Sequence, residues 1–190
     1  ALPMPGRFNV ANALVALAVS ELAGLPIEDA LAGIAHVVVP GRLQRIDEGQ
    51  DYLAIVDYAH KPAAVAAVIA TLRSEIKGRL CVVLGAGGDR DASKRAIMGR
   101  EAARGSDLFI VTDDNPRSED PAVIRAAVEA GAYELPTEER GEVRNIGDRA
   151  AAIRAAIAWA EPGDAVLVAG KGHETGQNVN GVIPVSYTHL

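Results

Sequence analysis

The fold class is decided by residues 79–104, which read RLCVVLGAGGDRDASKRAIMGREAAR. The apolar run at 79–84 has the length of a buried strand, and glycines end it. A helix is predicted over 93–104, after a polar turn. A strand that passes through a turn into a helix is typical of βαβ units, whose parallel strands are covered on both faces.

The same alternation of apolar runs and helical patterns continues on both sides of this stretch. The predicted strands are at 43–47, 52–57, 79–84, 107–112 and 164–169. The predicted helices are at 8–22, from 27 to about 34, and at 62–76, 93–104, 121–130 and 147–160, with 131–141 left irregular. We therefore predict an α/β fold with a doubly wound, mostly parallel sheet.

Composition excludes several classes of protein. Hydrophobic residues make up 49% of the 190 residues and charged residues 23%, as in a globular protein. The net charge of −6 argues against a nucleic-acid partner, and no apolar run is long enough for membrane insertion. Cys81 lies in an apolar run and is predicted to be an inert core residue. The chain begins at Ala1 without Met, so we expect a fragment, with a domain boundary at Pro40-Gly41.

Polar loops follow the predicted parallel strands. Because ligands bind beyond the carboxyl ends of such strands, these loops predict a composite site. They read DYAHKP at 57–62, GAGGDRD at 85–91, DDNPRSED at 113–120 and GKGHETGQ at 170–177.

The loop at 85–91 invites comparison with a dinucleotide fingerprint. Arg90 occupies the position of the third glycine of that motif, which lets helix and strand pack closely. We therefore favour a turn that presents Asp89, Arg90 and Asp91 to the site, with a plain glycine turn as the alternative.

The loop at 113–120 combines both signs of charge. Arg117 offers a planar fork for a carboxylate, while Asp114 and Asn115 can accept hydrogen bonds from an ammonium group. This combination suits a zwitterion such as an amino acid. An Asx-type turn with Arg117 in a surface ion pair is an equally open interpretation.

The loop at 170–177 places Lys171 between glycines, which suggests contact with an anion or phosphate. It is not a Walker A loop, because Gly172 replaces the Ser or Thr that holds Mg²⁺. Gln177 stands where H-E-x-x-H needs its second histidine, which disfavours a zinc protease. No cluster of metal ligands and no G-x-S-x-G elbow stands out in the sequence.

Together these loops resemble one family closely. The motifs that carry the resemblance are GRFNVANAL at 6–14, PGRLQ at 40–44, VDYAHKP at 56–62, GAGGDRDASKRAIMG at 85–99, TDDNPRSEDP at 112–121 and AGKGHETGQ at 169–177. In this order they resemble the C-terminal portion of Mur ligases of the MurE type. The resemblance implies that residues 1–40 are helices of a central ATP-binding domain, and that 41–190 form a Rossmann-like domain that binds the incoming amino acid.

The resemblance also implies an activity. These ligases use ATP to convert a substrate carboxylate into an acyl phosphate, which an amine then attacks, and Mg²⁺ stabilises the phosphates. The expected product comes from adding meso-diaminopimelate to UDP-N-acetylmuramoyl-L-alanyl-D-glutamate in peptidoglycan synthesis. ATP and Mg²⁺ are expected to be bound mainly by residues outside this chain. The chain is therefore expected to hold no catalytic residue and to be inactive alone, and the full enzyme to be a cytoplasmic monomer.

Site residues follow from the same resemblance. It assigns no metal ligand within this chain. The residues implied to bind meso-diaminopimelate are Arg90, Asp114, Asn115, Arg117, Gly170 and Glu174. Those implied to bind the nucleotide are Asn9, Asn12, Arg42, Asp57 and His60. Within the first set, Arg90 and Arg117 would bind carboxylates and Glu174 an ammonium group.

Two departures and two alternatives accompany this interpretation. Gln44 stands where many members have Glu, and residues 185–190 do not match the family. The alternatives are a ligase of the same superfamily that adds lysine or another amino acid, and an amino-acid-binding module without catalysis.

Overall fold

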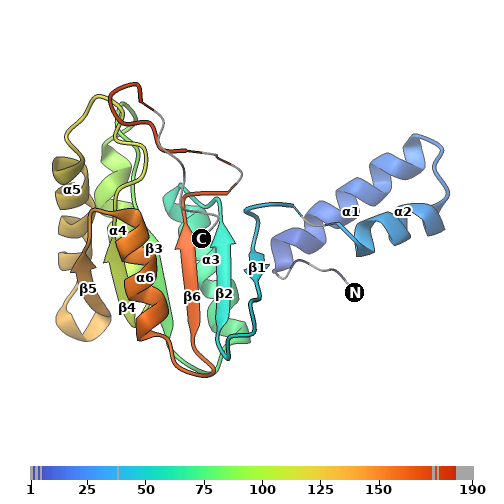
Figure 1. The fold of residues 1–190 in the computed structure, drawn as a ribbon. Helices are drawn as coiled ribbons and strands as arrows, with labels where there is room; N and C mark the ends of the chain where they lie inside the picture. The colour runs from blue at the N-terminus through green and yellow to red at the C-terminus, as the bar shows by residue number, and fades with distance from the viewer. Residues whose placement is uncertain are drawn as a thin grey trace.

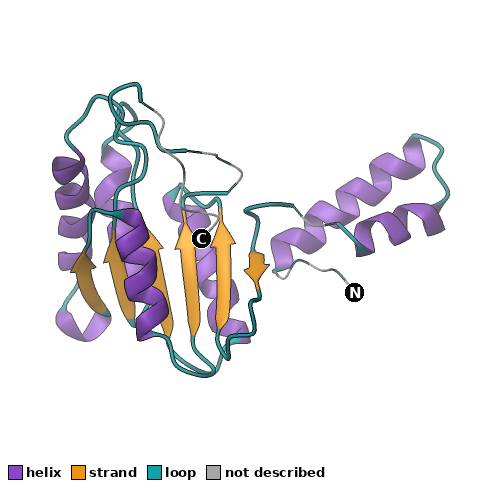
Figure 2. Ribbon diagram, in the orientation of Figure 1, coloured by secondary structure: helices purple, strands orange, loops and turns teal. Residues whose placement is uncertain are grey.

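The computed structural model describes residues 2, 4, 6–37, 39–172, 174 and 176–182. Within this part of the chain, a six-stranded sheet carries helices on both faces (Figures 1 and 2). The strands are β1 (Gln44–Ile46), β2 (Leu53–Asp57), β3 (Leu80–Leu84), β4 (Leu108–Val111), β5 (Glu142–Asn145) and β6 (Ala165–Ala169). The helices are α1 (Arg7–Leu22), α2 (Ile27–Ala35), α3 (Pro62–Glu75), α4 (Ser93–Gly105), α5 (Pro121–Tyr133) and α6 (Arg149–Trp159), with a 3-10 helix η1 (Thr137–Glu139).

The strand order confirms the predicted doubly wound, mostly parallel sheet. The order is β1-β2-β6-β3-β4-β5, and only the β1–β2 pair is antiparallel. From β2 the chain passes through α3, α4 and α5 on one face, reaching β3, β4 and β5 in turn. It then returns through α6 to place β6 between β2 and β3. Because parallel crossovers are right-handed, this reversal of direction puts α6 on the opposite face.

The core consists of two layers that share the sheet. Alternate residues of β3 point to opposite faces, and all five are buried. Leu80, Val82 and Leu84 pack with residues of α3, α4 and α5, whereas Cys81 and Val83 pack with residues of α6. This burial on both sides explains why the strand is apolar throughout.

Strand β5 and the end of α5 differ from the prediction. Residues 131–141 were expected to be irregular, but 131–133 complete α5, and Glu142–Asn145 form an edge strand beside β4. The side chains of Glu142 and Asn145 are exposed, so the strand carries no apolar alternation. Its place depends on the backbone ladder with β4, which a pattern of side chains does not reveal.

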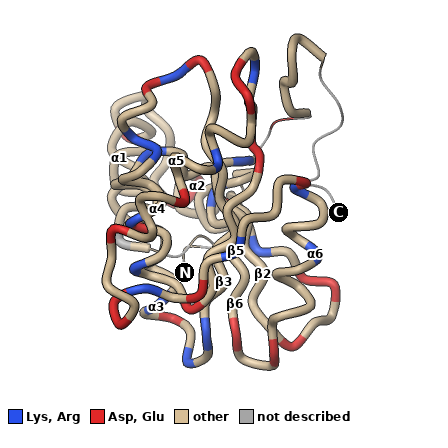
Figure 3. Tube along the Cα trace, turned by 90° about the vertical axis from the view of Figure 1, so that its left-hand side faces the viewer, with Lys and Arg blue, Asp and Glu red and all other residues tan. Residues whose placement is uncertain are grey.

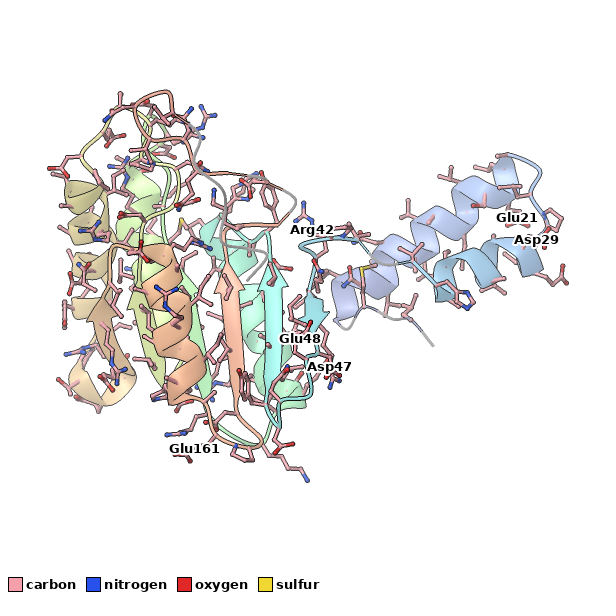
Figure 4. The ribbon with its side chains drawn as sticks, in the orientation of Figure 1. Glu21, Asp29, Arg42, Asp47, Glu48 and Glu161 are labelled. Atoms are coloured by element: carbon pink, nitrogen blue, oxygen red, sulfur yellow. The ribbon has the colours of Figure 1, made fainter. Side chains whose placement is uncertain are left out.

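Helices α1 and α2 form a hairpin that extends past the β1 edge of the sheet (Figure 1). Figure 4 shows Glu21 and Asp29 at the far end of this hairpin, away from the strands. Large apolar side chains of α1 are exposed, including Leu14, Val15 and Leu22. None of the described helices is long and apolar enough to cross a membrane. A domain boundary between residues 40 and 41 stays a prediction.

Helices α4 and α5 approach closely because each presents a glycine to the other. A Cβ at Gly99 would overlap the carbonyl oxygen of Val128, and one at Gly131 would overlap that of Ala96. These contacts leave no room for a methyl group on either side, so the backbones would have to separate.

We predict that Gly131→Ala lowers the free energy of unfolding of the chain by about 2 kcal/mol, because the added methyl group forces α4 and α5 apart. Gly33→Ala in α2 is the matched control, since no atom lies within 4 Å of the added Cβ. The control should gain stability, by up to about 1 kcal/mol, from helix propensity alone. Urea unfolding followed by circular dichroism measures both, and equal stability of the two variants would contradict the packing.

We also predict that Cys81 resists alkylation in the folded chain. Burial raises the pKa of this thiol to about 12, so little reactive thiolate exists at pH 8. Iodoacetamide at pH 8 should modify the folded chain at least ~100-fold more slowly than the chain in urea. Mass spectrometry against time measures the rates, and similar rates would show that Cys81 is not in the core.

Candidate functional site

The loops at the carboxyl ends of β2, β6, β3 and β4 meet at one edge of the sheet (Figure 1). They enclose a cavity of about 350 Å³. All six residues predicted to bind the amino acid line this cavity: Arg90, Asp114, Asn115, Arg117, Gly170 and Glu174. The structure thus brings together residues that lie up to 84 positions apart (174 − 90).

The cavity lining carries both signs of charge. Figure 3 shows acidic and basic positions interspersed along the loops at this end of the molecule. Besides the predicted residues, the cavity is lined by Lys61, Lys94 and Arg95, and by the carboxylate of Asp91. Lys94 is paired with Asp91, and Arg95 is paired with Glu119. Lys61 and Lys94 were not predicted to be part of the site; they lie at the start of α3 and of α4.

Arg117 is held across two loops. Its backbone has a φ of 53°, in the left-handed region, and its Nη1 donates to the carbonyl of Gly88 at 2.7 Å. Its backbone N–H donates to Asn178, and its carbonyl accepts from Asn180. Within the described residues the guanidinium bonds to backbone carbonyls rather than to a carboxylate, so the surface ion pair weighed above is not formed. Arg117 also lines the cavity.

Asp114 and Lys171 form an ion pair under the cavity. Lys171 Nζ lies 2.8 Å from Asp114 Oδ1 and 3.9 Å from Glu174 Oε1. The side chain of Lys171 is fully buried, and only 10% of the Asp114 side chain is exposed. Lys171 is therefore not placed to contact an anion or phosphate in solution, as its position between glycines had suggested. Its charge instead offsets part of the negative charge of the two carboxylates.

Asn115 joins its own loop to its neighbours. Its side-chain Oδ1 accepts from the backbone N–H of Asn178 at 2.8 Å, and its Nδ2 donates to Asp114. Its carbonyl accepts from Gly88 at 2.8 Å. Asn115 thus lines the cavity while its side chain helps to hold the loop, and its predicted binding role stays a prediction.

The loop at 85–91 is fastened to the loop at 113–120. Ser118 Oγ donates to Asp89 at 2.7 Å, and this bond holds the pKa of the Asp89 carboxyl below its usual range. The backbone N–H of Asp89 donates to Glu119, which also pairs with the buried Arg95. Asp89 is therefore turned toward Ser118, and Asp91 toward Ser93 and Lys94. Of the three residues expected to face the ligand, Arg90 retains an exposed side chain without such a fastening among the described contacts.

The residues predicted to bind the nucleotide fall into two groups. Asn9, Asn12, Arg42 and Asp57 line a second cavity, of about 610 Å³, between α1, α2 and α3. Its other lining residues are mostly apolar, among them Phe8, Ile34 and Val68. His60 instead lines the smaller cavity. Figure 4 shows Arg42 on the segment that joins the α1–α2 hairpin to β1.

Residues 57–61 form the wall between the two cavities. Asp57 and Ala59 line the larger cavity, whereas Tyr58, His60 and Lys61 line the smaller one. Asp57 Oδ2 accepts from the N–H of Leu43 at 2.8 Å, and its Oδ1 from the N–H of Ala59 at 2.7 Å. These two bonds fix the backbone on either side of Asp57, and the second forms an Asx-type turn at the end of β2.

Two buried residues behind the loops escaped the sequence analysis as parts of the site, namely Arg149 and Gln177. Arg149 lies at the start of α6, three, four and seven positions before Ala152, Ile153 and Ala156, which are buried. This spacing places it on the inward face of the helix and was a signal available in the sequence. Among the described residues, no group of three or more His, Cys, Asp and Glu side chains could hold a metal ion.

Comparison with known proteins identifies relatives. The family model described as "Mur ligase, glutamate ligase domain" matches residues 41–172. A UDP-N-acetylmuramoyl-L-alanyl-D-glutamate--2,6-diaminopimelate ligase of Corynebacterium efficiens is 64% identical over 183 residues, which cover 95% of this chain and 35% of the relative. The ligase of the same name from Bradyrhizobium diazoefficiens is 52% identical over 187 residues, 97% of this chain and 37% of the relative.

Solved structures with a similar fold include enzymes of the same kind. A ligase of that name superimposes with a TM-score of 0.72 at 38% identity, covering 97% of this chain and 37% of the other. A folylpolyglutamate synthase of Mycobacterium tuberculosis, complexed with ADP and AMPPCP, gives 0.66 at 26% identity, covering 90% and 39%. The chain thus spans about a third of the length of the curated relatives it matches. With the cavities, the sheet order and these matches in agreement, the chain belongs to the Mur ligase family and corresponds to the C-terminal part of its diaminopimelate-adding members.

Proposed function

We propose that this chain is the amino-acid-binding part of an ATP-dependent ligase of peptidoglycan synthesis. The complete enzyme joins meso-diaminopimelate to UDP-N-acetylmuramoyl-L-alanyl-D-glutamate in the cytoplasm. The observation that carries the proposal is the 350 Å³ cavity, which is lined by Arg90 and Arg117 as well as by Asp114 and Glu174. A cavity with both signs of charge is complementary to an amino acid whose far end is itself a zwitterion.

Each charged residue has a distinct role in this proposal. Arg117 and Arg90 bind carboxylates, since a guanidinium can donate two parallel hydrogen bonds to one carboxylate. Glu174 accepts from an ammonium group, with Asp114 beside it, and the carbonyl of Gly170 accepts a further hydrogen. Arg117 is already anchored to Gly88, so its direction is set before the ligand arrives.

The larger cavity suits the adenine of ATP. Its apolar lining would enclose a purine ring, while the side-chain amides of Asn9 and Asn12 supply hydrogen bonds to the ring edges. Arg42 is exposed beside this cavity and lies over the ring of Tyr58, 4.8 Å from its centroid. Its charge is available for phosphate oxygens. The described residues offer no fitting site for the Mg²⁺ that Mur ligases use, and no step of the reaction is assigned to this chain through a metal.

The shared wall relates the two cavities to the reaction. An acyl phosphate forms where the ATP phosphates meet the substrate carboxylate, and the amine of the incoming amino acid must reach it. Residues 57–61 line both cavities, so one stretch of chain lies between the two proposed ligands. We assign residues 1–40 to the central ATP-binding domain and 41–190 to the C-terminal domain, and the role of this chain is binding and orientation.

The two alternative functions would require different features of the two cavities. Lysine lacks the distal carboxylate, so a lysine-adding enzyme would leave Arg117 without a partner in the bound ligand. An amino-acid-binding module without catalysis would need no nucleotide cavity beside the amino-acid cavity, yet Asn9, Asn12 and Arg42 line one. Both observations favour the diaminopimelate ligase.

The proposal is tested with a chimera in which this chain replaces the matching 183 residues of the Corynebacterium efficiens relative. ADP release is measured with UDP-N-acetylmuramoyl-L-alanyl-D-glutamate and either meso-diaminopimelate, L-lysine or L-glutamate. We expect turnover with meso-diaminopimelate alone. Equal turnover with L-lysine would favour the first alternative, and no turnover with any amino acid would favour the binding module.

We predict that Arg117→Lys in this chimera raises the KM for meso-diaminopimelate by about 10- to 100-fold, because an ammonium cannot replace the bidentate fork. The KM for ATP should change little. The matched control is Arg45→Lys in β1, whose side chain is 65% exposed. Steady-state kinetics at saturating second substrate measures both constants, and an unchanged KM for diaminopimelate would remove Arg117 from the carboxylate site.

We predict the reverse pattern for Ala16→Phe, which fills part of the larger cavity. The KM for ATP should rise about tenfold or more, because the phenyl ring occupies the space of the purine. The KM for meso-diaminopimelate should stay unchanged. Ala18→Phe is the control, since Ala18 lies on the same helix and is exposed but does not line the cavity. Identical effects of the two substitutions on ATP binding would contradict the assignment of this cavity.

A further inference from the structure

Arg149 is a buried charge behind the amino-acid cavity. It opens α6, directly after Asp148, whose side chain caps the helix by accepting from Ala151. Only 1% of Arg149 is exposed. Burying a guanidinium is costly unless its hydrogen bonds are satisfied, so its contacts indicate why the position holds arginine.

The guanidinium joins two of the loops that form the cavity. Nη2 donates to the carbonyl of Ala169 at 2.9 Å, and Nη1 to the carbonyl of Asp113 at 3.3 Å. These carbonyls directly precede Gly170 and Asp114, both of which line the cavity. One side chain therefore fixes the distance between the loop after β6 and the loop after β4.

The charge of Arg149 also acts on the cavity. Within the described residues, no carboxylate lies within ion-pair distance of its guanidinium. Burial lowers the pKa of Arg149, while the negative charges of Asp114 and Glu174 oppose that shift. Arginine stays protonated even when buried, so a positive charge lies beneath the two acidic residues of the cavity.

Gln177 also binds the loop after β4, through hydrogen bonds of its own. Its Nε2 donates to the carbonyl of Asp114 at 2.8 Å and to that of Asp113 at 3.1 Å. The residue is 7% exposed. The Asp113 carbonyl thus accepts from two buried side chains, and both come from segments that follow the loop in sequence.

We propose that Arg149, assisted by Gln177, is a positioning residue for amino-acid binding: it holds the loops after β4 and β6 so that Asp114, Arg117 and Glu174 face one ligand. The inference rests on the proposed function, since it takes the ligand of the 350 Å³ cavity to be an amino acid. The inference adds Arg149, a buried residue that contacts neither ligand nor solvent. Arg149 acts on the site by binding the backbone carbonyls of Ala169 and Asp113.

The proposal predicts different effects on the binding of the amino acid and on the binding of ATP. Neither Arg149 nor the loops that it holds line the 610 Å³ cavity, so ATP binding should not depend on it. Loss of the guanidinium should therefore weaken the amino acid selectively. A purely structural role would lower the unfolding temperature without changing the ratio of the two KM values.

The experiment uses the chimera described above, first with its parent sequence and then with Arg149→Met, Arg149→Lys and Gln177→Met. Arg154→Met is the matched control, because Arg154 lies on the same helix with 67% of its side chain exposed. The KM for the amino acid that supports turnover, the KM for ATP and the unfolding temperature are measured for each. Arg149→Met should raise the KM for the amino acid about tenfold or more, and Arg149→Lys and Gln177→Met should raise it less. The KM for ATP should stay within about twofold, and Arg154→Met should match the parent.

An unchanged KM for the amino acid in Arg149→Lys and Gln177→Met would overturn the proposal. Equal rises in the KM for the amino acid and the KM for ATP would also overturn it. If Arg149→Met does not fold, these two milder variants decide the question. A parent that uses lysine instead of diaminopimelate would refute the proposed function while leaving the ratio of KM values to test the positioning role. A parent that uses no amino acid would overturn both.

Discussion

Parallel pairing of β2, β6, β3 and β4 is the constraint on which the site depends. Because these strands run in the same direction, their carboxyl ends lie at one edge, and four loops from distant parts of the sequence meet there. The reversal that inserts β6 between β2 and β3 brings Gly170 and Glu174 next to the loops after β3 and β4. Without this topology, the two arginines and the two carboxylates would not line one cavity.

Hydrogen bonds between the loops decide which charges remain for a ligand. Asp89 is bonded to Ser118, and Lys171 is buried beside Asp114, so neither faces the cavity freely. Arg90, Arg117 and Glu174 line the cavity. Preorganisation of this kind reduces the conformational entropy that binding would otherwise cost. The arrangement suits a ligand that carries both positive and negative groups.

Much of the fold could be predicted from the sequence, since β3, β4 and β6 are buried on both faces and read as apolar runs. Strand β5 could not, because none of the side chains of Glu142–Asn145 is fully buried and the strand pairs with β4 through its backbone, with Val143 alone packing against the core. The six residues assigned to the amino acid by resemblance do share a cavity, but their binding role stays a prediction. Asp57 and His60 line different cavities because the chain turns after β2, which the sequence pattern did not indicate. The inward position of Arg149 follows from a helical spacing that is easily overlooked for a charged residue.

The most direct test of the account is a crystal structure of the chimera with meso-diaminopimelate bound. The account predicts that the ligand occupies the 350 Å³ cavity, with one carboxylate on Arg117 and an ammonium group beside Glu174. It also predicts no diaminopimelate in the 610 Å³ cavity. Diaminopimelate found in the larger cavity, or in the smaller one with its carboxylates away from both Arg90 and Arg117, would contradict the account.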